Sequence, residues 1–181
     1  MATTHFSGPV ESDNGFVGSV TGGITGDVTG NLTGNVTGAV LASTPVNATA
    51  ATLAVAQATH GGRVVTLNRA AGIAVTLPAA TGSGAFYRFF IGTTVTSNTT
   101  TIKVTGNDTM SGLALMAQDA ADTVVGWETA ADTDTITFDG STTGGILGDF
   151  VELHDVATDK WYVRVTGSST GTEATPFSAT V

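Results

Sequence analysis

A repeat of four residues near the N-terminus constrains this chain more than any other feature. From Val20 to Val40 an aliphatic residue stands at every fourth position, Thr follows each of the first five, and Gly follows each Thr. A glycine in every turn, at about 1 kcal/mol each, together with β-branched neighbours excludes a stable isolated helix. In an extended chain, residues four apart share a face. The aliphatic edge consists of Val20, Ile24, Val28, Leu32, Val36 and Val40.

This aliphatic edge needs a partner, because one thin strand cannot shield it from water. The regular period indicates copies of the same chain, and collagen supplies the physical analogy: glycine recurs where backbones approach closely around an axis. We therefore predict that residues 17–41 form an intertwined trimeric β-rod, with the aliphatic side chains at the axis and Asp27, Asn31 and Asn35 in solvent. A flexible low-complexity linker is the alternative. A linker, however, has no reason to place an aliphatic residue at every fourth position.

Residues 1–16 are too short and too irregular to hold a core of their own. They are either a disordered tail, as termini often are, or an arm that becomes ordered on a partner. Two phenylalanines in so short a segment favour the arm, because solvated tails are poor in aromatic residues. The predicted contact residues of this arm are His5, Phe6, Pro9, Val10 and Phe16.

The remainder of the chain has the pattern of short strands. Residues 42–62 are a transition segment whose Ala-rich part is ambiguous between a short helix and a strand. In residues 63–181, apolar positions alternate with small or polar ones, as in Ile73, Val75 and Leu77, and turns rich in Gly and Asn separate the runs. We predict an all-β protein with an antiparallel β-sandwich of jelly-roll type over these residues.

Charge and composition limit the partners. The formal net charge is −9 and the first basic residue is Arg63, so the chain lacks the clustered cations that nucleic acids and anionic membranes require. There are no cysteines, which excludes a disulfide, a thiolate nucleophile and a Cys-based zinc site. No apolar run approaches the roughly 18 residues of a membrane span, and the N-terminus lacks a signal-peptide pattern. We expect synthesis in the cytoplasm.

No residue pattern predicts catalysis. The histidines are scattered, and we expect His60 to mark a turn and His154 to be a polar residue at a sheet edge. Oxygen-rich loops bind calcium, and two acidic groups are candidates, Asp132 with Asp134 and the cluster of Asp149, Glu152, Asp155 and Asp159, but neither has the alternating acids and central Gly of a calcium loop. A glycosidase needs two carboxylates across a cleft, and so acidic a chain offers many such pairs by chance. We predict no enzyme, no metal and no cofactor.

Two stretches resemble proteins of tailed bacteriophages. The repeat Val-Thr-Gly-Asn-Leu-Thr-Gly-Asn-Val-Thr-Gly is similar to stalk repeats in phage fibres and head appendages. The run that begins Val75-Thr-Leu-Pro-Ala-Ala-Thr-Gly-Ser-Gly-Ala-Phe-Tyr, with Ile102-Lys-Val, Asp132-Thr-Asp-Thr-Ile and Gly148-Asp-Phe-Val-Glu-Leu, resembles the C-terminal domain of phage virion proteins. Some of these are cement, or decoration, proteins on the phage head.

The resemblance implies a homotrimer bound to the major capsid protein on the outer surface of the phage head, with no catalytic residues. A short fibre or receptor-binding tip, whose aromatic residues stack on host glycan, is the alternative, and a carbohydrate-active enzyme is a more distant third. At 181 residues the chain is short for a fibre that must span a distance and also bind a receptor. Its length therefore favours decoration.

Overall fold

The computed structural model describes residues 44–120 and 122–180. The chain divides into two units, residues 1–39 and 40–181, and all described residues belong to the second. The arm predicted for residues 1–16 and the rod predicted for residues 17–41 lie outside the described residues, so both stay predictions.

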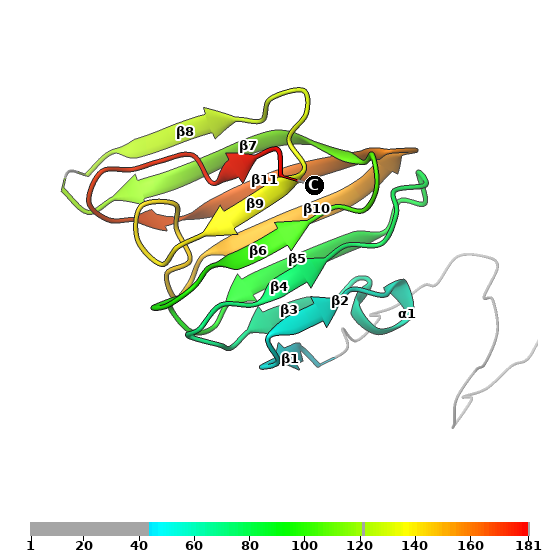
Figure 1. Cartoon of the computed structure of the whole chain (residues 1–181), viewed down its shortest axis with the longest axis horizontal. Coiled ribbons are helices and arrows are strands. Elements are labelled where there is room, and N and C mark those ends of the chain that lie inside the picture. Colours follow the sequence, from blue (N-terminus) through cyan, green and yellow to red (C-terminus); the bar gives the residue numbers. More distant parts are fainter. Residues whose placement is uncertain (1–43, 121, 181) are drawn as a thin grey trace, which may run out of the picture. The chain divides into compact units, whose positions relative to one another are not determined.

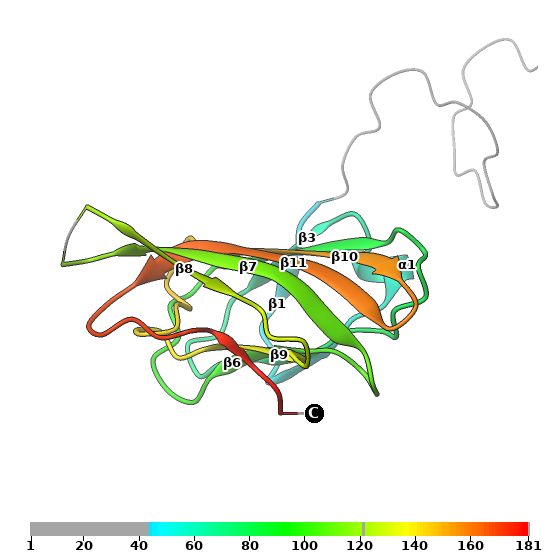
Figure 2. The same cartoon turned by 90° about the horizontal axis from the view of Figure 1, so that it is seen from above.

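The described residues form two β-sheets that lie one over the other (Figures 1 and 2). The seven-stranded sheet has, in spatial order, β1 (Val46–Ala48), β3 (Val64–Leu67), β5 (Phe86–Ile91), β10 (Phe150–Ala157), β11 (Lys160–Ser169), β7 (Thr109–Gln118) and β8 (Val124–Glu128). The five-stranded sheet has β12 (Phe177–Ser178), β9 (Thr135–Phe138), β6 (Thr100–Lys103), β4 (Ala74–Thr76) and β2 (Thr52–Ala54). This confirms the all-β prediction.

The first half of this fold is wound like a coil. From β1 to β7 the chain passes to the opposite sheet after every strand, and up to β6 the strands two apart in the sequence become neighbours. All of these pairs are parallel: β1 with β3 and β3 with β5 in one sheet, and β2 with β4 and β4 with β6 in the other. Parallel neighbours need a crossover connection, and here each crossover contains one strand of the facing sheet. Gly72 makes one of these turns possible with φ of 74°, where a Cβ atom would lie 2.2 Å from the Thr99 carbonyl oxygen.

The predicted antiparallel arrangement is therefore wrong for half of the strand pairings. The parallel pairs of the coil, and the long parallel pair of β7 with β11, stand beside antiparallel pairs such as β10 with β11 and β6 with β9. The physical reason is that alternation with a period of two shows which side chains point inward but carries no information about the direction of the neighbouring strand. Both sheets are mixed.

The inward-facing residues were predicted correctly. Ile73, Val75 and Leu77 are each 1 % exposed, and the inward side chains of β5, β10 and β11 are buried between the two sheets. The predicted hairpin is the antiparallel pair of β10 and β11, with Asp159 in the turn at φ of 58°. Trp161, the largest fully buried side chain, packs 5.8 Å from Tyr87 between ring centroids.

The β domain begins before the predicted position at residue 63. Strands β1 and β2 fall within residues 42–62; β1 belongs to the seven-stranded sheet and β2 to the five-stranded sheet. The Ala-rich part of this segment contains both a strand, β2, and a helix of one turn, α1 (Gln57–His60). Within the described ranges, no helix has the length and apolarity that crossing a membrane requires.

Candidate functional site

The residues predicted for self-association and capsid contact cannot be placed. The trimerisation residues Val20, Ile24, Val28, Leu32, Val36 and Val40 and the arm residues His5, Phe6, Pro9, Val10 and Phe16 all lie outside the described residues. The candidate site is therefore built from the sheet domain alone.

The carboxylate of Asp155 holds the loop that precedes β5. It accepts hydrogen bonds from the backbone N–H groups of Thr81, Gly82 and Ser83, at 2.7 to 3.1 Å, and from the Ser83 hydroxyl at 2.6 Å. Burial by itself raises the pKa of Asp155, but these hydrogen bonds outweigh it and lower the pKa from 3.8 to about 2. The side chain is a brace for a loop, with its acceptors occupied.

Asp149 is a second brace, in the loop before β10. It is 1 % exposed and accepts hydrogen bonds from the backbone N–H groups of Gly145, Ile146 and Ser168. Burial raises the pKa of this carboxyl, and the three backbone donors offset only part of that effect. Gly167 packs directly against it, since a Cβ atom there would lie 2.5 Å from the carboxyl carbon.

Two further buried aspartates act in the same way. Asp108 accepts hydrogen bonds from the Ala80 backbone N–H at 2.7 Å and from the Trp161 indole N–H at 3.3 Å. Asp134 accepts one from the Thr180 backbone N–H at 2.8 Å. Each carboxylate ties a loop or the C-terminal segment to the sheets.

The acidic groups weighed as calcium ligands do not converge. Asp132 is exposed whereas Asp134 is buried. Asp149 lies in the loop before β10 and Asp159 in the turn after it, while Glu152 and Asp155 lie within β10 on its outer and inner faces. In the part of the chain that the structure describes, no three His, Cys, Asp or Glu side chains are grouped so that they could hold a metal ion.

Neither described histidine has a catalytic environment. His60 ends α1, as predicted for a turn, and its Nδ1 lies 3.0 Å from the Ala56 backbone N–H, which donates to it. The sheet-edge position predicted for His154 is wrong, because β10 continues to Ala157 and lies between β5 and β11. His154 instead stands on the outer face of the seven-stranded sheet.

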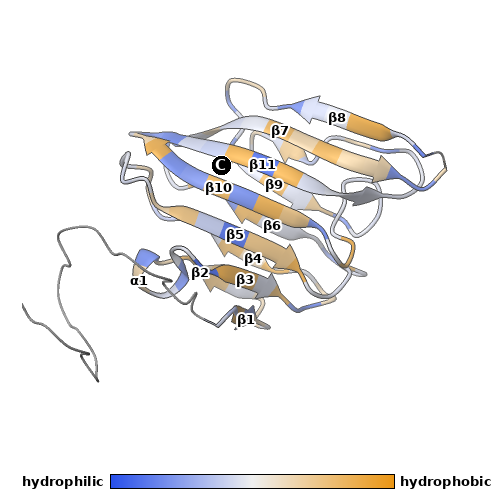
Figure 3. Cartoon of the chain, turned by 180° about the vertical axis from the view of Figure 1, so that it is seen from behind, coloured by the Kyte–Doolittle hydropathy of each residue, from blue (hydrophilic) through white to orange (hydrophobic). Residues whose placement is uncertain are grey.

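The outer face of the seven-stranded sheet carries both charged and apolar side chains. Its strands are registered so that outward residues form rows across the sheet. The central row consists of Val64, Arg88, Glu152, Arg164, Leu113 and Glu128, from β3 to β8. In Figure 3 the ribbons of β7 and of the first part of β8 are largely orange, a colouring that includes inward and outward residues alike. The outward apolar residues of these two strands are Leu113, Leu115, Ala117 and Val124.

Aromatic residues form the row next to the central one. The rings of Phe86 and His154 stack with centroids 5.7 Å apart, and His154 meets Tyr162 edge-on at 5.9 Å. The Arg88 guanidinium lies 4.9 Å from the centre of the Phe86 ring. These are cross-strand pairs of the kind that stabilise sheets. Tyr162, at 42 %, is the most exposed ring of this row.

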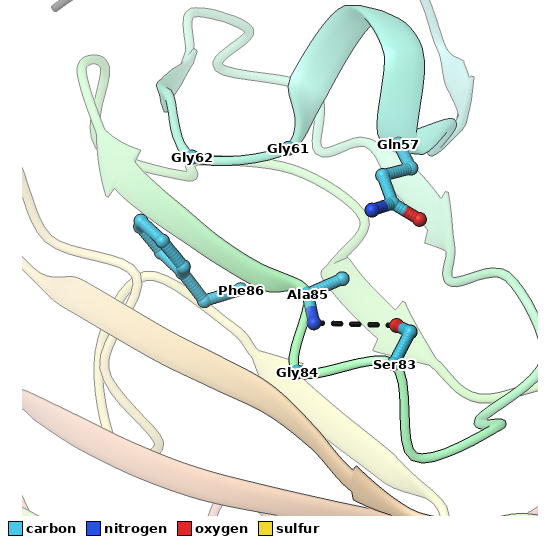
Figure 4. A pocket seen from close by; sticks show the side chains of 7 residues that line it. All are labelled: Gln57, Gly61, Gly62, Ser83, Gly84, Ala85 and Phe86. Carbon is cyan, nitrogen blue, oxygen red and sulfur yellow. Dashed lines mark hydrogen bonds between the residues drawn. The ribbon is translucent and has the colours of Figure 1, made fainter. Parts of the chain in front are cut away.

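A hollow of about 330 Å³ adjoins the aromatic row where β5 begins (Figure 4). The Gln57 side chain points toward Ser83 and Ala85, whereas the Phe86 ring lies on the other side of the strand (Figure 4). The Ser83 hydroxyl accepts a hydrogen bond from the Ala85 backbone N–H and donates to Asp155. Because Ser83 is already engaged in this loop, the hollow has one uncommitted polar side chain among its described lining residues, that of Gln57.

A strip of exposed apolar residues crosses β7 and β8. We define the β7–β8 strip as Leu113, Leu115, Ala117 and Val124; the two leucines are each 39 % exposed and Val124 is 64 % exposed. Gly126 stands opposite Leu115 on β8, and without a side chain there the surface is hollowed by about 260 Å³. Exposed apolar patches of this kind are typical of protein contact surfaces.

The outer face of the five-stranded sheet is different. One of its registered outward rows is small and mostly hydroxylated, with Thr52, Ala74, Thr101 and Thr137, and the other has Ala54, Thr76, Lys103 and Thr135. Leucine, phenylalanine and tyrosine are confined to the opposite outer face among these registered rows. The two sides of the domain are thus chemically unequal, and the seven-stranded side is the candidate interaction face.

No family model matches the chain, and neither does any curated protein or solved structure. The phage resemblance thus rests on the quoted residues alone. Because a fold does not determine a function, the function is argued from the repeat and from the chemistry of the interaction face.

The sequence reasoning did not find the strands that carry the strip. In β7 the inward residues Met110, Ala114 and Met116 alternate with outward Leu113 and Leu115, so both faces are apolar and the alternation disappears. The available signal was the uninterrupted apolar run from Leu113 to Ala117, bounded by Gly112 and Gln118, because such a run is typical of a strand with apolar residues on both faces.

Proposed function

We propose that this chain is a structural virion protein, a homotrimeric capsid decoration protein that binds the outside of a phage head and stabilises it. The observation that carries the proposal is the unbroken four-residue period from Val20 to Val40. A single extended chain cannot bury such an edge, whereas three copies around an axis bury it completely. Its partners on this view are two further copies and the major capsid protein.

The chemistry of the described domain supports a role in assembly. Its four most buried carboxylates brace loops, and most of its exposed large apolar residues, Leu147 in a loop apart, lie on the strands of the seven-stranded sheet. A protein that covers a shell must make lateral contacts on some faces and present polar surface on others. The Thr- and Ala-covered face of the five-stranded sheet suits solvent, and the seven-stranded face suits protein contacts.

The alternative is a fibre or receptor-binding tip that contacts host glycan. Tyr162 is the observation in its favour, because it is an exposed ring in an aromatic row whose far end, Phe86, lines a hollow. The other two rings of that row, Phe86 and His154, are half-buried and stack on each other, and Phe86 also contacts Arg88. A glycan platform normally presents open ring faces, so this alternative has less support.

Two measurements test the proposal. Light scattering on the purified full chain should give three times the chain mass of 18.1 kDa, and cryo-electron microscopy of purified particles should place the protein on the head exterior. A clean monomer at micromolar concentration contradicts the trimeric rod. Density on a tail fibre in place of the head would decide for the alternative.

A further inference from the structure

The β7–β8 strip has opposite charges on its two sides. Leu113 stands in the central row between Arg164 on β11 and Glu128 on β8. Arg164 and Glu128 are both exposed. Glu152 is registered with Arg164 on the side away from the strip, but among the described residues neither Arg164 nor Glu128 makes a side-chain hydrogen bond or ion pair. They are available to a second molecule.

We propose that the β7–β8 strip is a contact surface between two copies of this domain, packed face to face about a two-fold axis that runs along β7. Such an axis exchanges the two sides of the strip, so β11 of one copy faces β8 of the other. Arg164 then faces Glu128 of the second copy, twice, and the leucines of both copies meet on the axis. Face-to-face sheets prefer nearly aligned strands, and this axis keeps them aligned.

The charges select this axis over the other two-fold axis in the plane of the sheet. An axis perpendicular to the strands leaves each strand above its own counterpart, so an axis of this kind through the central row would set Arg164 against Arg164 and Glu128 against Glu128. No position of that axis brings Arg164 over Glu128, because the two residues are on different strands. Like charges in direct opposition are unfavourable. The axis along β7 is the one that brings opposite charges together.

Shape supports the same arrangement. The residue on β11 that is registered with Leu115 is Thr166, and the residue on β8 is Gly126. Under the proposed axis Thr166 of one copy lies above Gly126 of the other, where the surface is hollowed. A small branched side chain therefore meets the one gap in the strip. The surface is self-complementary, as an isologous contact must be.

The area of the contact predicts that it is weak by itself. Strands about 4.8 Å apart that rise about 3.3 Å per residue present on the order of 400 Å² over β11, β7 and β8, about half of the ~800 Å² that a stable interface takes from each partner. Several weak contacts act together when the copies are already linked. The role of this contact as a link between neighbouring trimers rests on the proposed function. The pairing itself needs only two copies of the domain.

Mixing two charge-reversal variants of the full chain tests the pairing. Arg164→Glu and Glu128→Arg each place two like-charge pairs in the contact, so each variant alone should self-associate at least roughly tenfold more weakly than the unmodified chain. An equimolar mixture should regain association, because a copy of one variant facing a copy of the other has opposite charges at both positions. Sedimentation across a concentration series measures this, and thermal unfolding checks that both variants fold.

The absence of cysteines permits an independent measurement. Ala117→Cys, on the axis, should be cross-linked between two chains by a short bismaleimide, whereas Thr137→Cys, on the outer face of the five-stranded sheet, should not. Association in units of trimers supports both proposals, and association of single chains into dimers supports the contact while contradicting the rod. The contact is overturned if the mixture stays as weak as its components, if either reversal leaves association unchanged, or if both cysteine variants cross-link equally.

Discussion

At the scale of single residues, the acidic character of this protein has a structural use. Asp108, Asp134, Asp149 and Asp155 are nearly inaccessible to solvent and accept hydrogen bonds from backbone N–H groups of loops. A coil of short strands has many turns whose backbone donors cannot all be paired within sheets, and a buried carboxylate satisfies several at once. The sequence shows these acids but not their partners, because the partners are up to 74 residues away.

Replacing Asp155 with Asn tests this role. The amide group brings N–H donors toward the donors of Thr81, Gly82 and Ser83 and removes the charge that strengthens their hydrogen bonds. We expect Asp155→Asn to lower the free energy of unfolding by about 2 kcal/mol, measured by urea denaturation. The matched control is Glu152→Gln on the outer face of the same strand, where a change of more than a few tenths of a kcal/mol would contradict the distinction.

The same carboxylate predicts a pH dependence. Because folding lowers the pKa of Asp155 to about 2, its stabilising effect is complete above the ordinary value of 3.8 and is lost as the pH falls from there to about 2. Burial raises the pKa of Asp149, so protonation of that group works in the opposite direction. The difference between the unmodified chain and Asp155→Asn isolates Asp155. It should shrink as the pH is lowered from 5 to about 2, and a constant difference would refute the assignment.

At the scale of elements, the longest parallel pairing depends on one glycine. Gly112 on β7 is registered with Val163 on β11, and a Cβ atom at Gly112 would lie 1.8 Å from the Val163 carbonyl oxygen. This oxygen belongs to the backbone of the neighbouring strand, so it cannot move aside as the end of a flexible side chain can. We expect Gly112→Ala to destabilise the fold by about 3 kcal/mol or more, measured by thermal and urea unfolding.

Gly126 on β8 supplies the matched control for that substitution. A Cβ atom there meets the end of the Leu115 side chain at 3.3 Å, and that side chain is exposed and can move. Gly126→Ala should therefore change the stability by less than about 1 kcal/mol. Equal losses from the two substitutions would mean that β7 and β11 are not paired in this register.

These elements also mark the limit of what the sequence could predict. The alternating runs at Ile73 to Leu77 and at Trp161 to Val165 identified core strands correctly, since one face is buried and the other is not. The strands β7 and β8, which carry the interaction face, were missed because their apolar residues point both ways. The parallel winding was missed because it depends on which strand lies beside which, and no local pattern contains that information.

At the scale of the whole molecule, the repeat and the sheet domain have separate tasks. Replacing both Val28 and Leu32 with Asp should dissociate the predicted trimer, because carboxylates near a shared axis lack partners and repel one another. Replacing Asp27 and Asn31 with Ser should leave the trimer intact. Light scattering distinguishes the two double variants. If both dissociate, or neither does, the inward and outward positions of the repeat are assigned wrongly.

The last prediction assigns capsid binding to residues 1–16. This segment has two Phe and a Pro but no basic residue, so it cannot bind an acidic surface by charge attraction. Apolar anchoring combined with strand addition to an exposed sheet edge of the shell fits its composition better. A variant that lacks residues 2–15 should still form trimers and keep its far-ultraviolet β signal, yet fail to bind particles stripped of the native protein.

Salt dependence separates this mode of binding from an electrostatic one. Binding of the full chain to stripped particles should change little between low and high salt, because few ion pairs contribute. The Arg164→Glu variant is the control, since it alters the proposed contact between sheet domains and leaves residues 1–16 unchanged; single trimers of it should still bind. If the truncated chain decorates stripped particles as well as the full chain does, the sheet domain faces the shell and the orientation proposed for the molecule is reversed.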